Sequence, residues 1–337
     1  MATREKKDAT PPPTPFADAV SAYGRGDYTM ALSLFSDAAA AGDAAAQYNL
    51  GFLHDTGRGV PADAATARDW YEKAAAQGYA AAEYKLGEMH ETGRGVPVDP
   101  AVAANWYRLA AQRNHTIAQF RLGTNCDAGR GTPRDPAEAA KWLRKAADQN
   151  HAGAQYALGA KHAKGDGVPK DVAAAIGWYR KAAAQNHAGA QYDLGVLYGS
   201  GEGVARNYPE ALRWFLKAAQ QHHASAQYNL GVMYGGGRGV VADPREAARW
   251  YRAAADQGHA GAQYNLGAIC AAGDGVRADP MEAYKWFTLA ADGFPESRAS
   301  ARELALEQRA QLAAGMSEEQ IAEAQRRAQA WSPVRTP

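Results

Sequence analysis

The sequence predicts an all-α fold, a solenoid of stacked helix pairs, from three observations. Leu-Gly pairs recur with a constant step of 36 residues, at Leu50, Leu86, Leu122, Leu158, Leu194, Leu230 and Leu266. Seven of the eight tryptophans keep the same step, from Trp70 to Trp286, and only Trp331 lies outside it. Each interval holds two segments with a helical pattern. A fixed period in this range is typical of a solenoid, because each unit buries its apolar face only against its neighbours.

The first segment of each repeat predicts an amphipathic helix. In the copy AAAQYNLGFLHDT, residues 44–56, the side chains of Gln47, Leu50, Gly51 and His54 fall on one stripe. Their spacing of three, four and seven residues is that of one helix face. Because glycine has no side chain, Gly51 on that stripe allows a neighbouring helix to come close.

The second segment starts at an N-cap signal. Aspartate followed by proline provides a side-chain acceptor and then a residue suited to the first helical position, at Asp99, Asp135, Asp243 and Asp279. Glutamates three residues later have the spacing of a capping box, at Glu138, Glu246 and Glu282. The segment then carries a tryptophan and a second aromatic residue, such as Trp106 and Tyr107. It is predicted to end near residues that suit a left-handed turn, at Gly78, Asn114 and Asn150.

Weaker copies of the pattern extend the array in both directions. Residues 16–42 are predicted as a degenerate N-terminal capping repeat, because Leu34, Phe35 and Gly42 lie 36 residues before Trp70, Tyr71 and Gly78. Seven full repeats are predicted over residues 43–292, and two helices over residues 293–332 are expected to cap the exposed end. Residues 1–15, rich in proline and threonine, are predicted as a disordered tail, and residues 333–337 as a second tail.

Composition and charge exclude several classes of protein. Hydrophobic residues make up 46% and charged residues 22%, which suits a folded chain. Lys plus Arg total 37 against 36 for Asp plus Glu, so the chain has no large net positive charge that would attract nucleic acid. No apolar run of about 18 residues predicts insertion into a membrane, and the start MATREKKDATPPPTPF lacks the apolar stretch of a secretory signal. We therefore expect a cytoplasmic protein, or a periplasmic one if a signal has been removed.

The loop DTGRGVPAD, residues 55–63, has the glycine pair and arginine of a phosphate-binding loop. The same glycine pair recurs in all seven repeats, with Arg, Asp or Glu between its members, and acidic residues repel an anion. A phosphate loop also usually follows a strand, whereas here a helix is predicted before it. We therefore interpret the glycines as residues needed for backbone angles that other residues adopt only at a cost.

Two further columns of side chains recur at the repeat step. One column is filled by His54, His90, Cys126, His162, Tyr198, Tyr234 and Cys270. It predicts packing against the paired helix and no metal site, because stacked helices lie roughly 8 to 10 Å apart and zinc ligands must converge on one ion. The other column lies near the starts of the first helices, at His115, His151, His187, His223 and His259. These histidines are either plain residues at helix starts or sensors of mild acid. No catalytic set, metal site or cofactor is predicted.

The stretch AQYNLGVMYGGGRGVVADPREAARWYRAAADQGHAGAQ, residues 226–263, resembles the Sel-one-like repeat, a relative of the tetratricopeptide repeat. The resemblance covers residues 43–292 in seven copies. It implies a right-handed superhelix of antiparallel helix pairs whose first helices line the concave side. It also implies a protein-interaction scaffold or adaptor, without enzymatic activity, in signalling, secretion or envelope regulation. The abundance of Ala, Arg and Gly suits a bacterial member.

Two alternative functions stay open beside the scaffold. One branch of the family pairs two cysteines within each repeat and includes members linked to β-lactam binding. The corresponding alternative is a binder of small molecules or cell-wall fragments with weak hydrolase activity. Cys126 and Cys270 lie in different repeats, so the chain departs from that branch. The second alternative is a structural, self-assembling array.

The residues opposite the Leu-Gly stripe are expected to face the concave groove. They form an aromatic ladder that either contacts a partner or packs between repeats, Tyr48, Tyr84, Phe120, Tyr156, Tyr192, Tyr228 and Tyr264. At a later position of the same helices, the first three repeats carry Asp55, Glu91 and Asp127. The other four carry small residues there, Ala163, Gly199, Gly235 and Ala271. The acidic N-terminal half predicts a basic peptide or protein segment as partner, unless these acids are plain solvated surface.

Overall fold

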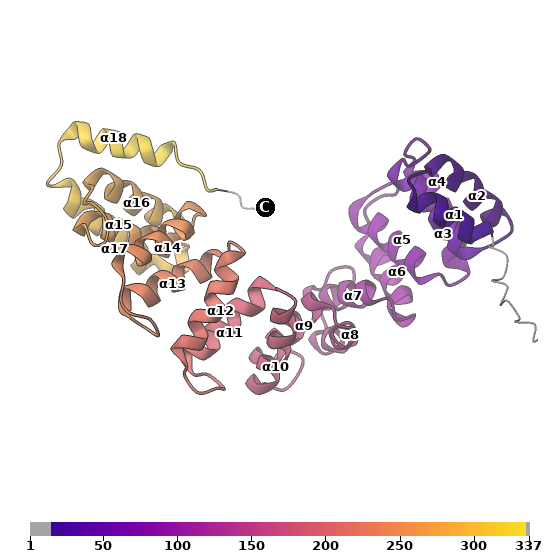
Figure 1. Ribbon diagram of the computed structural model, residues 1–337, viewed down its shortest axis with the longest axis horizontal. Helices are drawn as coiled ribbons and strands as arrows, with labels where there is room; N and C mark the ends of the chain where they lie inside the picture. Colours follow the sequence, from indigo (N-terminus) through magenta and orange to yellow (C-terminus); the bar gives the residue numbers. More distant parts are fainter. Residues whose placement is uncertain (1–14, 335–337) are drawn as a thin grey trace, which may run out of the picture. The chain divides into compact units, whose positions relative to one another are not determined.

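In the computed structural model, which describes residues 15–334, all regular secondary structure is helical (Figure 1). Eighteen α-helices and one short 3₁₀ helix follow one another, and no strand occurs within these residues. The predicted all-α repeat fold is therefore confirmed. The predicted N-terminal tail, apart from Pro15, and residues 335–337 lie outside the described residues.

Nearly all repeat helices have the same length of 13 residues, in keeping with the constant sequence step. The helices are α1 Pro15–Gly24, α2 Tyr28–Ala40, α3 Ala44–Thr56, α4 Ala64–Ala76, α5 Ala80–Thr92, α6 Pro100–Gln112, α7 Thr116–Ala128, α8 Pro136–Asp148, α9 Ala152–Lys164, α10 Val172–Ala184, α11 Ala188–Ser200, α12 Tyr208–Gln220, α13 Ala224–Gly236, α14 Pro244–Asp256, α15 Ala260–Ala272, α16 Pro280–Gly293, η1 Glu296–Arg298, α17 Ala299–Ala313 and α18 Glu318–Gln329.

The helices group into two compact units. Unit 1 runs up to Ala154 and includes Gly165–Pro169, whereas unit 2 consists of Gln155–Lys164 and the chain from Lys170 onward. Within unit 1, successive helices from α1 to α8 pack against each other in sequence order. Within unit 2, the same order holds from α10 to α17, and α18 packs against α16.

Close packing within a repeat depends on the glycine of the Leu-Gly pair. In α11, Gly195 lies against the ring of Phe215 in α12, and a Cβ on Gly195 would come within 2.6 Å of that ring. In α5, a Cβ on Gly87 would come within 2.5 Å of the ring of Tyr107. The neighbouring leucines, such as Leu194 and Leu230, are completely buried. Glycine therefore allows the aromatic ring of the second helix to lie directly on the first helix.

The second helices begin at the predicted N-caps. The side chain of Asp135 accepts hydrogen bonds from the backbone amides of Ala137 and Glu138. The predicted capping boxes at the glutamates are wrong, because Glu138 instead accepts from the indole Nε1 of Trp142 at 2.7 Å. The same correction holds for Glu246 and Glu282, which pair with Arg249 and Lys285 one turn further along their own helices.

The predicted left-handed turns close the second helices. Gly78 and Asn114 have positive φ of 77° and 64°. Asn150 and Asn186 adopt the same conformation at φ of 65° and 62°. Asparagine tolerates this region better than most residues with a side chain, which explains why it replaces glycine at these positions.

The two glycines of each loop have separate roles. Gly57, at φ of 70°, ends α3, and its amide donates to the carbonyl oxygen of Leu53. The second glycine brings the loop against the preceding repeat: a Cβ on Gly131 would lie 1.9 Å from the carbonyl oxygen of Pro100. The interpretation of these glycines as backbone residues is therefore confirmed, and the loops also set the distance between repeats.

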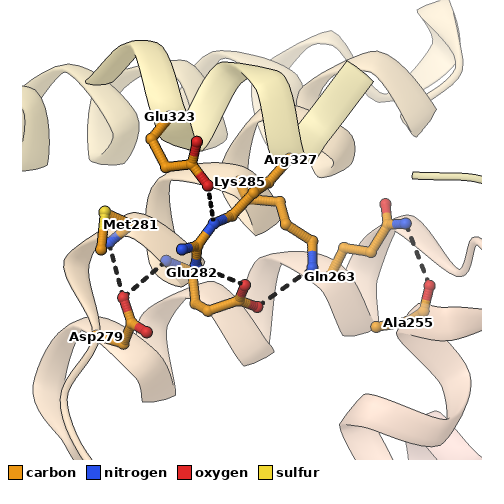
Figure 2. A network of polar contacts seen from close by, with 8 residues as sticks. All are labelled: Ala255, Gln263, Asp279, Met281, Glu282, Lys285, Glu323 and Arg327. Carbon is orange, nitrogen blue, oxygen red and sulfur yellow. Dashed lines mark hydrogen bonds and ion pairs between the residues drawn. The ribbon is translucent and has the colours of Figure 1, made fainter. Parts of the chain in front are cut away.

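Buried glutamines connect successive helices. Gln47 donates to the carbonyl oxygen of Ala39 at 3.3 Å and accepts from Gln77 at 2.8 Å. Figure 2 shows the equivalent bond in unit 2, from Gln263 to the carbonyl oxygen of Ala255. Since a buried amide without partners is costly, these bonds let glutamine occupy a core position. In α5 the same position carries Glu83, which pairs with Arg113 at 3.0 Å.

Polar contacts attach α18 to α16 at the C-terminal end (Figure 2). The guanidinium of Arg327 lies 3.4 Å from Glu282 of α16 and 2.9 Å from Glu323 of its own helix. The ring of Trp331 meets Trp286 edge-on at 6.4 Å between centroids. At the start of α18, Ser317 and Gln320 form a complete capping box. The single tryptophan outside the repeat pattern thus covers the last tryptophan within it.

Candidate functional site

The predicted aromatic ladder lies at the junctions between repeats. The ring of Tyr84 contacts Tyr107 of α6 at 5.7 Å and stacks on His115 at 4.8 Å, which precedes the next first helix. Phe120 stacks in the same way on His151 at 4.5 Å. The same contacts to the second helix of the repeat are made by Tyr48, Tyr156, Tyr192, Tyr228 and Tyr264. Tyr84 is buried and the other six are half-buried, so packing between repeats accounts for these contacts, and a role in partner binding stays a prediction.

The predicted histidine column caps the first helices. The Nδ1 atom of His115 accepts a hydrogen bond from the amide of Ala118 at 3.2 Å. The next four histidines make the same bond at 3.1 to 3.3 Å, His151, His187, His223 and His259. Burial lowers the pKa of each of these five imidazoles below its usual value. The neutral form is therefore the one that both caps the helix and stacks on the preceding repeat.

The predicted acidic residues have partners within the protein. Asp55 is only 7% exposed, and its carboxylate lies 3.2 Å from Nε of Arg94 in the next loop. Glu91 accepts a hydrogen bond from the hydroxyl of Tyr107 at 2.7 Å and lies 3.8 Å from Arg130. Asp127, which is half-buried, accepts from Arg134 through its backbone oxygen at 3.1 Å. Because Asp55 and Glu91 are compensated internally, the attraction of a basic partner to them stays a prediction.

Replacing Asp55 with serine should lower the free energy of unfolding by about 1 kcal/mol, because Arg94 loses a largely buried partner. Urea denaturation of the full chain measures the loss. If stability were unchanged while binding of a basic partner weakened, the carboxylate would be acting on the partner and not within the fold.

The residue between the two loop glycines contacts the preceding repeat in most copies. Arg58 lies over the rings of Tyr23, Tyr28 and Phe52, at 5.5 to 5.8 Å from their centroids. The next four copies form ion pairs, Arg94 with Asp55, Arg130 with Glu91, Asp166 with Arg134 and Glu202 with Lys170. The side chains of Arg238 and Asp274 make no ion pair or hydrogen bond with the part of the chain that the structure describes.

Two clefts open in unit 2 at the positions of Gly199 and Gly235. The cleft at Gly199 has a volume of about 240 Å³ and lies between α11, α12 and α13. Its lining includes Val196, Tyr208, Phe215, Val232 and Met233, and also Arg238. The equivalent cleft at Gly235 measures about 270 Å³, with Tyr251, Ile269 and Asp274 among its lining residues. The sequence shows that the repeat position of Asp55, Gly199 and Gly235 changes from acidic to small residues. The clefts were not predicted, because each depends on how three helices pack.

Exposed apolar residues adjoin these clefts. Val196 of α11 is 38% exposed, and Val232 of α13 holds the same repeat position and is half-buried. At the equivalent position in unit 1, α5 and α7 carry the polar residues Glu88 and Thr124, whereas α3 carries Phe52. The first helices of unit 2 therefore present an apolar row beside two clefts, which suits contact with another protein.

The two cysteines lie in the core of their repeats. Cys126 and Cys270 are buried free thiols, and burial raises the pKa of each. Between residues 15 and 334, no three His, Cys, Asp or Glu side chains form a group suited to a metal ion. Every helix in the same range is too short or too polar to cross a bilayer. The predicted packing of the two cysteines is confirmed by their burial.

Comparison with known proteins supports the repeat assignment. A family model described as Sel1 repeat matches residues 44–79, 80–115, 116–151, 152–187, 188–223, 224–259 and 260–293. The solved structure of a Sel1 repeat protein from Oxalobacter formigenes is 32% identical, with a TM-score of 0.67, over 85% of this chain and 86% of that chain. A protective antigen present in uropathogenic Escherichia coli strains, which displays an SLR fold, is 28% identical, with a TM-score of 0.46, over 93% of this chain and 83% of that chain. No curated protein matches the chain.

Proposed function

Because the chain belongs to the Sel1 repeat family, we propose that it is a scaffold that binds a partner protein or peptide along the first helices of its repeats. Proteins of this family are generally protein-interaction scaffolds, and their solenoid fold is typically non-catalytic. The observation that supports the proposal most directly is the apolar row of Val196 and Val232 beside the clefts at Gly199 and Gly235. Large apolar side chains left exposed beside clefts are typical of contact surfaces.

The mechanism of such a scaffold is the display of side chains from successive repeats. A bound segment buries its own apolar side chains against the row and in the clefts, and the partner's orientation follows from the polar groups at their edges. We place this function in bacterial signalling, secretion or envelope regulation, with binding on the concave side. The alternative of a β-lactam or cell-wall-fragment binder gains no support from the two cysteines, which lie in separate repeats as free thiols.

The double substitution V196E/V232E is expected to abolish partner binding while the fold persists, because it puts two carboxylates on the apolar row. Val196 and Val232 are partly exposed, so the charges remain in contact with water. Affinity purification from bacterial extracts with mass spectrometry identifies the proteins held by the wild-type chain and lost by the variant. Val241, which is 86% exposed in a loop of the same unit, provides the matched control V241E.

The control variant is expected to retain every partner. Recovery of the same proteins by V196E/V232E and wild type would contradict binding at this surface. Binding of muropeptides or β-lactams in a direct screen, with no protein partner recovered, would favour the alternative function.

A further inference from the structure

The cleft at Gly199 has a counterpart in unit 1 that is lined by one of the protein's own carboxylates. Asp55 and Gly199 hold the same position in their repeats, as do Arg94 and Arg238. In unit 1, a pocket of about 230 Å³ is lined by Asp55, Met89 and Arg94, and the Asp55 carboxylate pairs with Arg94. This position between repeats is therefore able to hold an acid against the loop arginine.

In unit 2 the acid is missing and the arginine is retained. Gly199 contributes no side chain, and a Cβ built on it would meet only the Cβ of Ala211, at 3.7 Å. Arg238 lines the open cleft and is its only charged lining residue, with no ion pair or hydrogen bond from its side chain to the described residues. A second cation lies nearby, since Arg206 is 6.0 Å from the ring centroid of Tyr208, which forms one wall.

The size and walls of the cleft restrict the class of ligand. At about 240 Å³, the cleft is smaller than a typical site for a drug-sized molecule but has room for one side chain. Its walls are formed largely by Val196, Phe215 and Met233, which suit the methylene groups of a side chain. A guanidinium in the lining suits a carboxylate, which it binds by charge-assisted hydrogen bonds.

We propose that the cleft between Gly199 and Arg238 binds the side-chain carboxylate of an aspartate or glutamate in the partner peptide. The bound acid takes the place that Asp55 occupies in unit 1 and pairs with Arg238 as Asp55 pairs with Arg94. This inference rests on the proposed scaffold function and specifies one feature of its partner. It differs from the basic partner expected from Asp55, Glu91 and Asp127, which concerns the other unit.

The neighbouring cleft provides a natural comparison. Gly235 lies at the same position in α13 as Gly199 in α11, and a Cβ on it would meet Ala247 at the same 3.7 Å. The loop residue at this cleft is Asp274 instead of arginine. An acid is therefore expected to be stabilised at Gly199 and repelled at Gly235, although a Cβ has the same space at both positions.

The first experiment installs the acid within the protein. G199D is expected to unfold at a temperature about 2 to 4 °C higher than G235D, because only the first aspartate gains an ion pair. Both substitutions introduce aspartate into the last turn of a helix, so the unfavourable effects of the helix dipole cancel in the comparison. Adding R238A to each variant should remove the part of the difference that comes from the ion pair and leave the part that comes from repulsion by Asp274. Equal unfolding temperatures for G199D and G235D would overturn the inference.

The second experiment tests a partner peptide directly. A phage-displayed library of random peptides is selected on the full chain, and the enriched peptides are synthesised with C-terminal amides, so that only side chains supply carboxylates. We expect enrichment of Asp or Glu and at least about tenfold weaker binding to R238A and to G199D. R245A, which changes an exposed arginine in α14, is the matched control and should retain wild-type affinity.

The outcomes separate this inference from the scaffold function. Selected peptides without acidic residues, or peptides that bind R238A and G199D as well as wild type, would overturn the inference and leave the scaffold function standing. If no peptide were selected and no protein partner were recovered, both would be overturned.

Discussion

Replacing Gly131 with alanine should lower the free energy of unfolding by about 3 kcal/mol or more, a large effect for a loop residue. Gly131 has φ of 68°, a conformation that costs an L-residue about 1 kcal/mol or more. Its Cβ would also lie 1.9 Å from the carbonyl oxygen of Pro100 and 2.3 Å from the carbonyl carbon. Because these atoms belong to the backbone of the preceding repeat, the clash is relieved only by moving one repeat away from the other.

The first glycine of the same loop provides the matched control. Gly129 has nearly the same φ, 69°, but the closest atom to its Cβ is Cβ of Arg134 at 3.4 Å. G129A is therefore expected to cost about 1 kcal/mol, from backbone strain alone. Urea denaturation followed by circular dichroism measures both variants. Equal losses would mean that the close approach to Pro100 contributes nothing to the junction between repeats.

Lowering the pH from 7 to 5 is expected to destabilise the protein through the five capping histidines. The unfolded imidazole has a pKa of about 6.5, whereas burial holds the pKa of His115 and its four equivalents lower in the folded state. Below about pH 6.5 the unfolded chain therefore binds more protons. The stabilisation is complete above that pH and is lost as the pH falls through the lower folded pKa values.

Protonation acts directly on the contacts between repeats. The proton adds to Nδ1, which accepts the hydrogen bond from the amide three residues later, so the cap is lost. Each lost N-cap costs about 1 kcal/mol, and five together amount to about 5 kcal/mol at full protonation. Neighbouring charges modify single sites: Glu88 raises and Lys85 lowers the pKa of His115, and Arg298 lowers that of His259.

Replacement of all five histidines with asparagine is the test. Asparagine is a strong N-cap residue and does not titrate, so the variant keeps the caps and loses the pH dependence. Thermal unfolding of both chains between pH 7 and 5 gives the comparison, and because both share the same carboxylates, the difference reports the histidines. A pH profile in the variant that matches the wild type would rule out the histidine column as its cause. Whether partner affinity follows the same pH dependence stays a prediction, which the same pair of chains can test.

Helix boundaries and the repeat array could be predicted from the sequence, because local physics decides them. Asp135 caps a helix through amides two and three residues away, and Asn114 ends one through its own backbone angle. Gly51 predicts close packing, because a glycine on the buried face of a helix leaves room for a neighbouring helix. These effects act within one or two helical turns. They recur in each repeat, so the constant 36-residue step allowed them to be recognised in the sequence.

The partners of polar side chains were decided only by the tertiary structure. Asp55 meets Arg94, which lies in the next repeat, and Glu282 of α16 meets Arg327 of α18. The sequence determined that the repeat position of Asp55 is glycine at Gly199. The packing of α11, α12 and α13 determined that a cleft lies there beside Arg238. Hydrogen bonds within a helix follow from local spacing, whereas ion pairs and clefts depend on how far apart packed helices lie.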